Sequence, residues 1–287
     1  MDAGCLAAPG AFNALCARAV ARAGFRAAYV SGAATSVAAG VPDVGLLTLE
    51  HFARTVREVS SASGLPVLAD ADTGFGEAEM VRRTVVEYAR AGAAGLHVED
   101  QKFPKRCGHL DGKELVGVDH MCEKIEWACR AARECEAARG FVVCARTDAR
   151  GVEGFDAATS RARAYVEAGA EMIFPEGLIS ADEFSRFRAA LSSTRTRSGR
   201  PAPYLLANMT EFGKTPSITL SAFEAMGYSC VIFPVSLLRV AMGAVARALE
   251  QLRRDGSVQG FVGQMQTRQE LYDLVGYVPG TPWDFPA

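Results

Sequence analysis

The chain of 287 residues lacks the features that mark several large classes of protein. Arg or Glu interrupts every apolar run before the roughly 18 residues that span a bilayer, which predicts no membrane partner. The 31 basic and 33 acidic residues nearly cancel, so no excess of positive charge favours nucleic acid. The eight cysteines include no Cys-x-x-Cys pair, which argues against a disulfide framework and favours a reducing compartment.

The N-terminus also lacks a recognisable targeting signal. Met-Asp-Ala-Gly-Cys has neither the basic region nor the apolar core of a secretory signal. We therefore expect a cytoplasmic protein. The mitochondrial matrix is the alternative if the source is a eukaryote and a transit peptide is absent from this sequence.

The sequence instead contains an alternation of short apolar runs with longer segments of helical periodicity. Continuous apolar strands between helices are typical of a parallel sheet that is buried on both faces. The runs lie at 4–8, 27–31, 66–70, 95–99, 141–146, 172–175, 204–208 and 230–234. The helical segments lie near 11–23, 48–62, 77–91, 119–138, 156–168, 181–191, 219–226 and 236–254.

Eight such units predict an α/β fold, a (β/α)8 TIM-type barrel, with an open doubly wound sheet as the alternative. No Gly-x-Gly-x-x-Gly opens the first helix, which weakens the dinucleotide-binding form of that alternative. We expect one domain over 1–287, with a functional loop at about 101–118 and a helical C-terminal segment at about 262–287. The polar stretch 192–203 is expected to be an exposed connection.

Polar residues follow several of the predicted strands, where a barrel builds its active site. Asp70 and Asp72 are two positions apart, so both side chains project to one face of a strand, and Glu99 ends the next strand. Hard oxygen ligands of this kind suit Mg²⁺, with Mn²⁺ as a substitute. An isolated Asp-x-Asp more often caps a turn, but Glu99 and the following loop favour the metal site.

The predicted loop contains Lys105-Arg106-Cys107-Gly108-His109. Cations and an imidazole beside a thiol lower its pKa and suit it to acid or base chemistry. The alternative is an exposed polar loop with an incidental thiol. Arg146 and Arg239 would both face the barrel mouth, where each guanidinium requires an anion. Glu176 or a substrate carboxylate can supply it, which predicts a small substrate with several carboxylates.

These motifs together resemble the isocitrate lyase/phosphoenolpyruvate mutase superfamily. The resemblance rests on Lys-Arg-Cys-Gly-His, Ala-Asp-Ala-Asp-Thr-Gly-Phe-Gly at 69–76, Gly-Leu-His-Val-Glu-Asp-Gln at 95–101, Ala-Arg-Thr-Asp-Ala at 145–149 and Asn-Met-Thr-Glu-Phe-Gly at 208–213. Within the superfamily, the segments around 174–176, 233–239 and 265–272 are most similar to lyases that cleave 2-methylisocitrate. The resemblance implies a Mg²⁺-dependent carbon–carbon lyase that releases pyruvate and succinate, assembled as a homotetramer that exchanges a C-terminal helix between subunits.

The resemblance also implies a role for each matching residue. Asp70, Asp72 and Glu99 would hold the metal ion. Cys107 would be the catalytic acid, with His109 beside it, and Tyr29 is our candidate for the base that takes the hydroxyl proton. The substrate carboxylates would be held by Ser31, Gly32, Ala33, Asp43, Lys105, Arg106, Gly108, Arg146, Glu176, Asn208, Met209, Thr210, Arg239 and Arg268.

Two alternatives stay open at the level of sequence. A related enzyme of the same fold would act on oxaloacetate, isocitrate or a carboxyphosphonate, and Lys102-Phe103-Pro104 is similar to such relatives. The loop cysteine argues against a phosphomutase, whose chemistry requires no thiol acid. A catalytically silent barrel that acts as a scaffold would have lost motif residues, but the metal, acid and anion-binding positions are all occupied.

Overall fold

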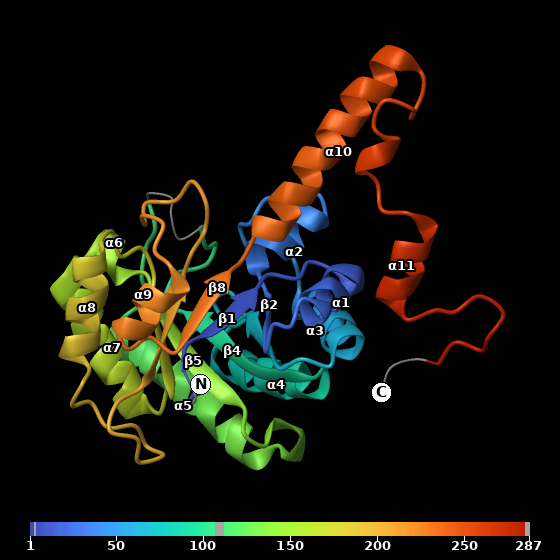
Figure 1. The fold of residues 1–287 in the computed structure, drawn as a ribbon. Coiled ribbons are helices and arrows are strands. Elements are labelled where there is room, and N and C mark those ends of the chain that lie inside the picture. Colours follow the sequence, from blue (N-terminus) through green and yellow to red (C-terminus); the bar gives the residue numbers. More distant parts are fainter. Residues whose placement is uncertain (3, 107–111, 285–287) are drawn as a thin grey trace.

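The computed structural model describes residues 1–2, 4–106 and 112–284, in which eight parallel strands form one sheet (Figure 1). The strands are neighbours in the order β1-β8-β7-β6-β5-β4-β3-β2. A parallel bridge joins Gly10 to Tyr29, so the β1 and β2 edges meet and the sheet curves into a barrel. The strands are β1 (Leu6–Pro9), β2 (Ala28–Val30), β3 (Val67–Asp70), β4 (Ala93–Glu99), β5 (Val142–Thr147), β6 (Met172–Pro175), β7 (Tyr204–Asn208) and β8 (Cys230–Phe233).

This topology confirms the predicted (β/α)8 barrel, and the open-sheet alternative is wrong. The eight predicted helical segments all contain helices, and the fold adds two short ones, α2 and α6, which directly follow β2 and β5. The α-helices are α1 (Ala14–Arg22), α2 (Gly32–Ala38), α3 (Leu49–Ser63), α4 (Ala78–Arg90), α5 (Val118–Glu134), α6 (Ala149–Val152), α7 (Phe155–Ala168), α8 (Ala181–Ala190), α9 (Leu220–Ala225), α10 (Ser236–Asp255) and α11 (Arg268–Val275). Two 3₁₀ turns lie at Glu136–Ala138 and Val262–Gln264.

Hydrophobic packing leaves the carboxyl edge of the barrel for polar residues. One cluster fills the barrel interior with Tyr29, Phe174, Leu206 and Ile232 among its members. A larger cluster lies between the sheet and the helices, where the amphipathic helices bury one face. Since both clusters are apolar, the charged residues at the strand ends are confined to one edge, where their side chains are held close together.

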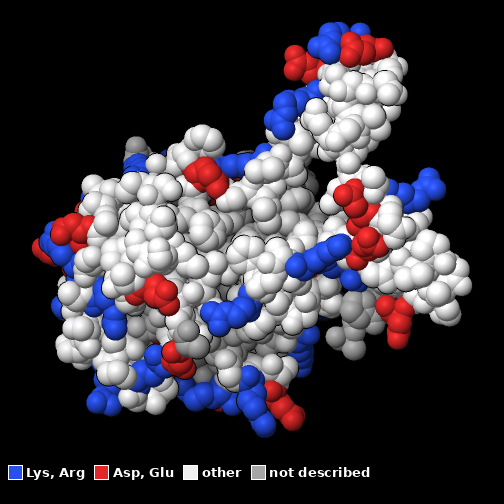
Figure 2. All heavy atoms as spheres, viewed as in Figure 1, with Lys and Arg blue, Asp and Glu red and all other residues white. Residues whose placement is uncertain are grey.

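The α10 helix departs from this arrangement and projects away from the barrel (Figure 1). Among its residues only Leu238 is buried, whereas Val240 is 71% and Leu249 59% exposed. In Figure 2 much of the projecting arm is uncharged, and charged side chains gather at its far end. Within the described residues, no helix is long and apolar enough to cross a membrane.

Candidate active site

Asp70 ends β3 at the carboxyl edge of the barrel and is fixed by backbone donors. Its Oδ2 accepts a hydrogen bond from the amide of Gly32 at 3.0 Å, and its Oδ1 accepts one from the amide of Asp72 at 2.9 Å. A Cβ at position 32 would lie 2.6 Å from Oδ2, so glycine is required for this close approach. Burial alone would raise the pKa of Asp70, but His97 and Lys105 bring it below the ordinary value. The carboxylate is therefore ionised.

Asp72 lies beside a buried lysine. Its backbone is left-handed, with φ 45°, a conformation that is uncommon outside glycine and is enriched at functional sites. The Nζ of Lys105 is 2.8 Å from Asp72 Oδ1 and also contacts Asp43. Burial raises the pKa of Asp72 to about 6, although the charge of Lys105 opposes the shift. Three residues that are distant in sequence thus form one charged cluster.

Glu99 completes the predicted metal site and has an unsatisfied oxygen. Its amide donates to the carbonyl of Asp72 at 2.9 Å, which places the two strand ends side by side. Its Oε2 is 3.2 Å from Arg146 Nε, but its buried Oε1 has no hydrogen-bond partner. Burial raises the pKa of Glu99 well above its ordinary value. An orphaned carboxyl oxygen beside two aspartates fits a hard cation, which would satisfy it.

The cation would not be enclosed by protein ligands alone. In the described part of the chain, no three acidic, histidine or cysteine side chains converge as a ready-made metal site. Mg²⁺ usually keeps several waters and binds through one or two carboxylates together with substrate oxygens. The residues therefore fit a partly hydrated magnesium ion that binds with substrate.

Arg146 ends β5 and is surrounded by carboxylates. The Asp148 carboxylate accepts hydrogen bonds from Arg146 Nε at 2.9 Å and from Arg146 Nη2 at 3.2 Å. Glu176 Oε2 lies 3.7 Å from the same Nη2. The guanidinium also lies 5.1 Å from the ring centre of Phe174. The sequence predicted Glu176 or a substrate as the anion and missed Asp148, which is the principal partner. A guanidinium has five N–H donors, so Asp148 uses only some of those of Arg146, which also lines the cavity at the barrel mouth.

Tyr29 and His97 form a buried pair at the bottom of this region. The two side chains share a hydrogen bond of 2.7 Å between Tyr29 Oη and His97 Nε2. Burial raises the pKa of Tyr29 well above its ordinary value and lowers the pKa of His97 to about 4. His97 Nδ1 has no hydrogen-bond partner and lies 3.7 Å from Asp70 Oδ1. The contacts of His97 place it between the candidate base, Tyr29, and the candidate metal ligand Asp70.

A cavity of about 90 Å³ brings many of the predicted residues together at the barrel mouth. Its lining includes cations, carboxylates and one side-chain amide from most of the strand ends, so a small polyanion would meet positive charge beside the candidate metal ligand Asp70. The predicted residues that line it are Tyr29, Ser31, Ala33, Asp43, Asp70, Lys105, Arg106, Arg146, Glu176, Asn208, Thr210 and Arg239.

Other predicted residues lie elsewhere. The side chain of Met209 is buried in the core outside the barrel, where its Sδ accepts a hydrogen bond from the amide of Ile218 at 3.5 Å, and it does not line the cavity. Its role as a substrate ligand stays a prediction. Side chains alternate along an extended segment, and both neighbours of Met209 face the cavity. Arg268 begins the exposed helix α11 and does not line the cavity of its own chain, because α10 carries this segment away. Cys107, Gly108 and His109 lie outside the described residues.

Arg239 reaches the cavity from the first turn of α10. Its Nη1 is 3.1 Å from Glu211 Oε2 and donates to the Glu211 carbonyl at 2.6 Å. The side chain is 43% exposed, and its guanidinium lies 5.2 Å from the ring centre of Phe212. Arg239 is therefore held at the rim, where solvent weakens its pairing with Glu211 and a substrate carboxylate can replace that contact.

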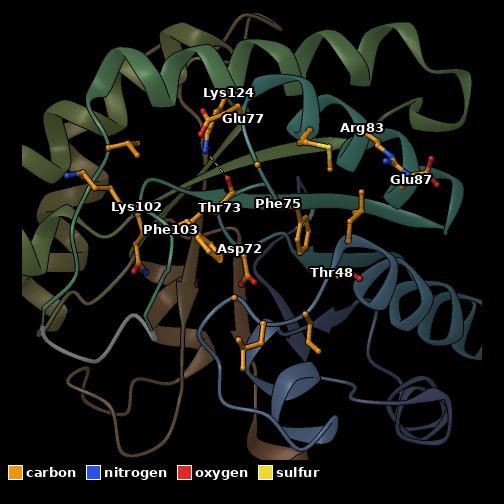
Figure 3. Close-up of a pocket in the computed structure, with 18 of the residues that line it drawn as sticks. Thr48, Asp72, Thr73, Phe75, Glu77, Arg83, Glu87, Lys102, Phe103 and Lys124 are labelled. Carbon is orange, nitrogen blue, oxygen red and sulfur yellow. Dashed lines mark hydrogen bonds between the residues drawn. The ribbon is translucent and has the colours of Figure 1, made fainter.

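A larger cavity of about 1130 Å³ adjoins this site on the outer side of β3 and β4. Asp72 and Gln101 contribute to its wall, together with apolar residues such as Phe75 and Phe103 (Figure 3). Lys124 donates to the carbonyl of Thr73 at 3.1 Å and so supports the turn after Asp72. The Asp72 end of the site is thus open to a wide, mainly apolar recess.

Comparison with known proteins agrees with this geometry. The family described as phosphoenolpyruvate phosphomutase matches residues 1–253. A probable 2-methylisocitrate lyase of Corynebacterium glutamicum is 49% identical over 269 residues, which cover 94% of this chain and 84% of that protein. The chain belongs to the phosphoenolpyruvate mutase/isocitrate lyase superfamily. A 2-methylisocitrate lyase of Aeropyrum pernix is 46% identical over 270 residues, with 94% and 82% of the two chains covered.

Solved structures of the superfamily share the fold. The crystal structure of 2,3-dimethylmalate lyase matches with a TM-score of 0.86 and 37% identity, covering 95% of this chain and 87% of that one. A phosphonopyruvate hydrolase in complex with oxalate and Mg²⁺ matches with a TM-score of 0.81 and 31% identity, covering 96% and 92%. The resemblance seen in the sequence motifs is confirmed, and the divalent metal found in a relative suits the acidic strand ends described above.

Proposed function

We propose that this protein is a carbon–carbon lyase that cleaves 2-methylisocitrate to pyruvate and succinate. The main support for the proposal is the cavity at the barrel mouth, which Asp70 lines together with the cations Lys105 and Arg146. These two cations also contact the other acidic strand ends, Asp72 and Glu99. A substrate with several carboxylates and a hydroxyl matches that charge pattern. The curated 2-methylisocitrate lyases that match most of this chain support the same substrate.

The residues present would hold Mg²⁺, or Mn²⁺ in its place, at Asp70, Asp72 and Glu99. When bound, the metal ion supplies a Lewis acid that polarises the substrate hydroxyl and an adjacent carboxylate. Lys105 neutralises Asp72 and Asp43 and holds their carboxylates in position. Arg146, Asn208 and the rim residue Arg239 orient the remaining carboxylates.

Three proton transfers complete the cleavage. Tyr29 is protonated in the resting protein because burial raises its pKa, so it can take the hydroxyl proton only as its own proton passes to His97 Nε2. As the bond between the hydroxyl-bearing carbon and the succinate half breaks, the electron pair remains on the succinate half. We assign Cys107 to the protonation of that carbon, with His109 beside it in the chain.

A substrate panel tests the proposal. Purified protein with Mg²⁺ is incubated with 2-methylisocitrate, isocitrate, oxaloacetate and a carboxyphosphonate, and pyruvate, succinate and glyoxylate are quantified. We expect the highest kcat/KM for 2-methylisocitrate. A higher value for oxaloacetate or a phosphonate would replace the substrate but retain the fold and the metal site.

Arg239→Ala discriminates a tricarboxylate from smaller substrates. Loss of this rim cation is expected to raise KM for 2-methylisocitrate about tenfold, the effect of roughly one charged hydrogen bond, with a smaller change in kcat. Steady-state kinetics give both constants. Arg253→Ala on the same helix, far from the mouth, is the matched control. An unchanged KM for Arg239→Ala would favour a two-carboxylate substrate.

We also infer that 1–287 form one barrel domain with a C-terminal helical extension, and that the chain assembles as a homotetramer by exchanging α10. The support is the projection of α10, which exposes Val240, Met242 and Leu249 at 71%, 51% and 59% and itself extends away from the barrel after β8, although α11 returns to contact α1. Exposed apolar surface of this extent indicates an association site. The exchange would also carry Arg268 to a neighbouring subunit.

Leu249→Glu is expected to dissociate the assembly, because a carboxylate would be buried at the contact without a partner. Light scattering after size exclusion should give a mass near four times 30.5 kDa for the natural protein and a lower multiple for the variant. Arg247→Glu changes a charge on the same exposed helix and serves as the control. A tetramer that persists in Leu249→Glu would contradict exchange through this face.

A further inference from the structure

Asp100 is a fully buried carboxylate that the proposed chemistry does not use. It follows Glu99 at the end of β4, and side chains alternate there, so Glu99 faces the mouth while Asp100 faces the surrounding helices. It does not line the cavity. Burial of a carboxylate destabilises the fold unless hydrogen bonds satisfy its oxygens, so Asp100 requires several partners.

The partners of the Asp100 carboxylate lie either in the segment 147–148 or on α7. Its Oδ1 accepts the amide of Asp148 at 2.9 Å, and its Oδ2 accepts the hydroxyl of Thr147 at 2.7 Å. The same Oδ2 accepts the hydroxyl of Tyr165, on α7, at 2.8 Å. Asp100 therefore fixes the backbone at 147–148, which is the segment that places the Asp148 side chain.

The Asp148 side chain in turn orients the guanidinium of Arg146. Its two oxygens accept Nε and Nη2, an arrangement that fixes the plane as well as the position of the guanidinium. Lys113 Nζ donates to Asp148 Oδ1 at 2.8 Å and holds the carboxylate from the other side. A small rotation of Asp148 would turn the donors of Arg146 away from the cavity.

A second layer of contacts connects Tyr165 to the protein framework. Arg161 Nη1 donates to Tyr165 Oη at 3.1 Å and to the carbonyl of Val116 at 2.9 Å, and it lies 3.5 Å from Asp100 Oδ2. Glu153 pairs with the other nitrogens of Arg161 at 2.7 and 2.8 Å. Arg161, on α7, thus compensates the negative charge of Asp100. The network is rigid because each of its members has several partners.

We propose that Asp100, supported by Thr147 and Tyr165, is a positioning residue that sets the orientation of the Arg146 guanidinium toward a substrate carboxylate. The network acts through Asp148 and touches no reacting atom. The inference rests on the proposed function only in taking the carboxylate-bearing substrate from it. The geometry predicts that weakening the network lowers affinity for carboxylates more than it lowers the rate of the chemical step.

The test compares buried hydroxyl groups inside and outside the network. Tyr165→Phe removes a bond to Asp100, whereas Tyr228→Phe removes an equally buried hydroxyl that donates to the carbonyl of Phe184 at 3.2 Å on α8. We expect Tyr165→Phe to raise KM for 2-methylisocitrate about tenfold with kcat changed less than about threefold. Tyr228→Phe should leave KM unchanged even where it lowers the unfolding temperature equally.

A pair at position 147 separates positioning from simple packing. Thr147→Ser keeps the hydroxyl that bonds Asp100, and Thr147→Val keeps the shape without it. The serine variant should retain the natural KM, and the valine variant should show the same rise as Tyr165→Phe. If Tyr165→Phe and Thr147→Val match their controls in KM, the proposal is overturned.

Binding of succinate in the presence of Mg²⁺, measured by calorimetry, keeps the test independent of turnover. We expect the dissociation constant of succinate to rise about tenfold in Tyr165→Phe and Thr147→Val and to stay unchanged in Tyr228→Phe and Thr147→Ser. This result would support the positioning role even if the natural protein failed to cleave 2-methylisocitrate. Equal affinities in all four variants would refute the role whatever the substrate is.

Discussion

Arg146→Met is expected to lower kcat/KM by about 10³-fold or more, the effect of removing a preorganised donor to substrate charge. It should also lower the free energy of unfolding by about 3–5 kcal/mol, because Glu99 and Asp148 lose a buried cationic partner. Steady-state kinetics and urea unfolding measure the two effects. The size of both losses follows from one side chain that binds substrate and balances the acidic strand ends.

Acid unfolding gives an independent view of the same variant. Burial would raise the pKa of Asp148, but Arg146 and Lys113 lower it to about 2, below its ordinary value. The ionised carboxylate therefore stabilises the fold at neutral pH, and this contribution is lost as the pH falls toward 2. Without Arg146 the pKa of Asp148 rises, so we expect the acid-unfolding midpoint of Arg146→Met to move to higher pH.

Arg150→Met is the matched control for Arg146→Met. Arg150 lies four positions further along the chain and pairs in the same two-pronged way with Glu183, but it is partly exposed and outside the cavity. We expect its kcat/KM to be unchanged and its stability to fall by no more than about 1 kcal/mol. Equal losses in the two variants would contradict a specific role for Arg146.

Cys107→Ala is expected to lower kcat by about 10²- to 10⁴-fold, the usual effect of a positioned acid, with little change in stability. The thiol stands between Arg106 and His109 in the sequence, and the proposed chemistry assigns it the last proton transfer. Pyruvate release measures turnover. Succinate binding should persist, since the proposed metal ligands and Arg146 are unchanged.

Cys135→Ala provides the comparison for Cys107→Ala. Cys135 follows α5 as a half-buried free thiol and lies outside the mouth cavity, so its removal should leave kcat at the natural value. Substantial turnover in Cys107→Ala, at a rate near that of Cys135→Ala, would remove the thiol from the mechanism and require another acid.

The barrel was predictable because strands buried on both faces leave a strong signal in the sequence. Asp70, Asp72 and Glu99 could also be found, since they directly follow such strands. The short helices α2 and α6 were missed because a single turn or two of small residues has no amphipathic periodicity. The outward direction of the Met209 side chain was also predictable, because side chains alternate along β7 and the residues after it, and its neighbours Asn208 and Thr210 line the cavity.

Long-range pairing was the part that sequence could not supply. Two examples are the paired hydrogen bonds between Asp148 and Arg146 and the contact between Lys105 and Asp43. Both depend on the directions of side chains at the barrel rim, which no local sequence pattern predicts. The projection of α10 was equally hard to predict, since the sequence pattern of an amphipathic helix does not show whether its apolar face packs on its own barrel or on another subunit. Both gaps concern contacts between elements rather than the elements themselves.

The most direct test of the central claim is the stoichiometry of cleavage by the purified protein with and without divalent metal. We expect that 2-methylisocitrate is converted to equimolar pyruvate and succinate, that chelation stops the reaction, and that added Mg²⁺ restores it. Release of neither product above background with Mg²⁺ present, from protein that still binds succinate, would contradict the assignment.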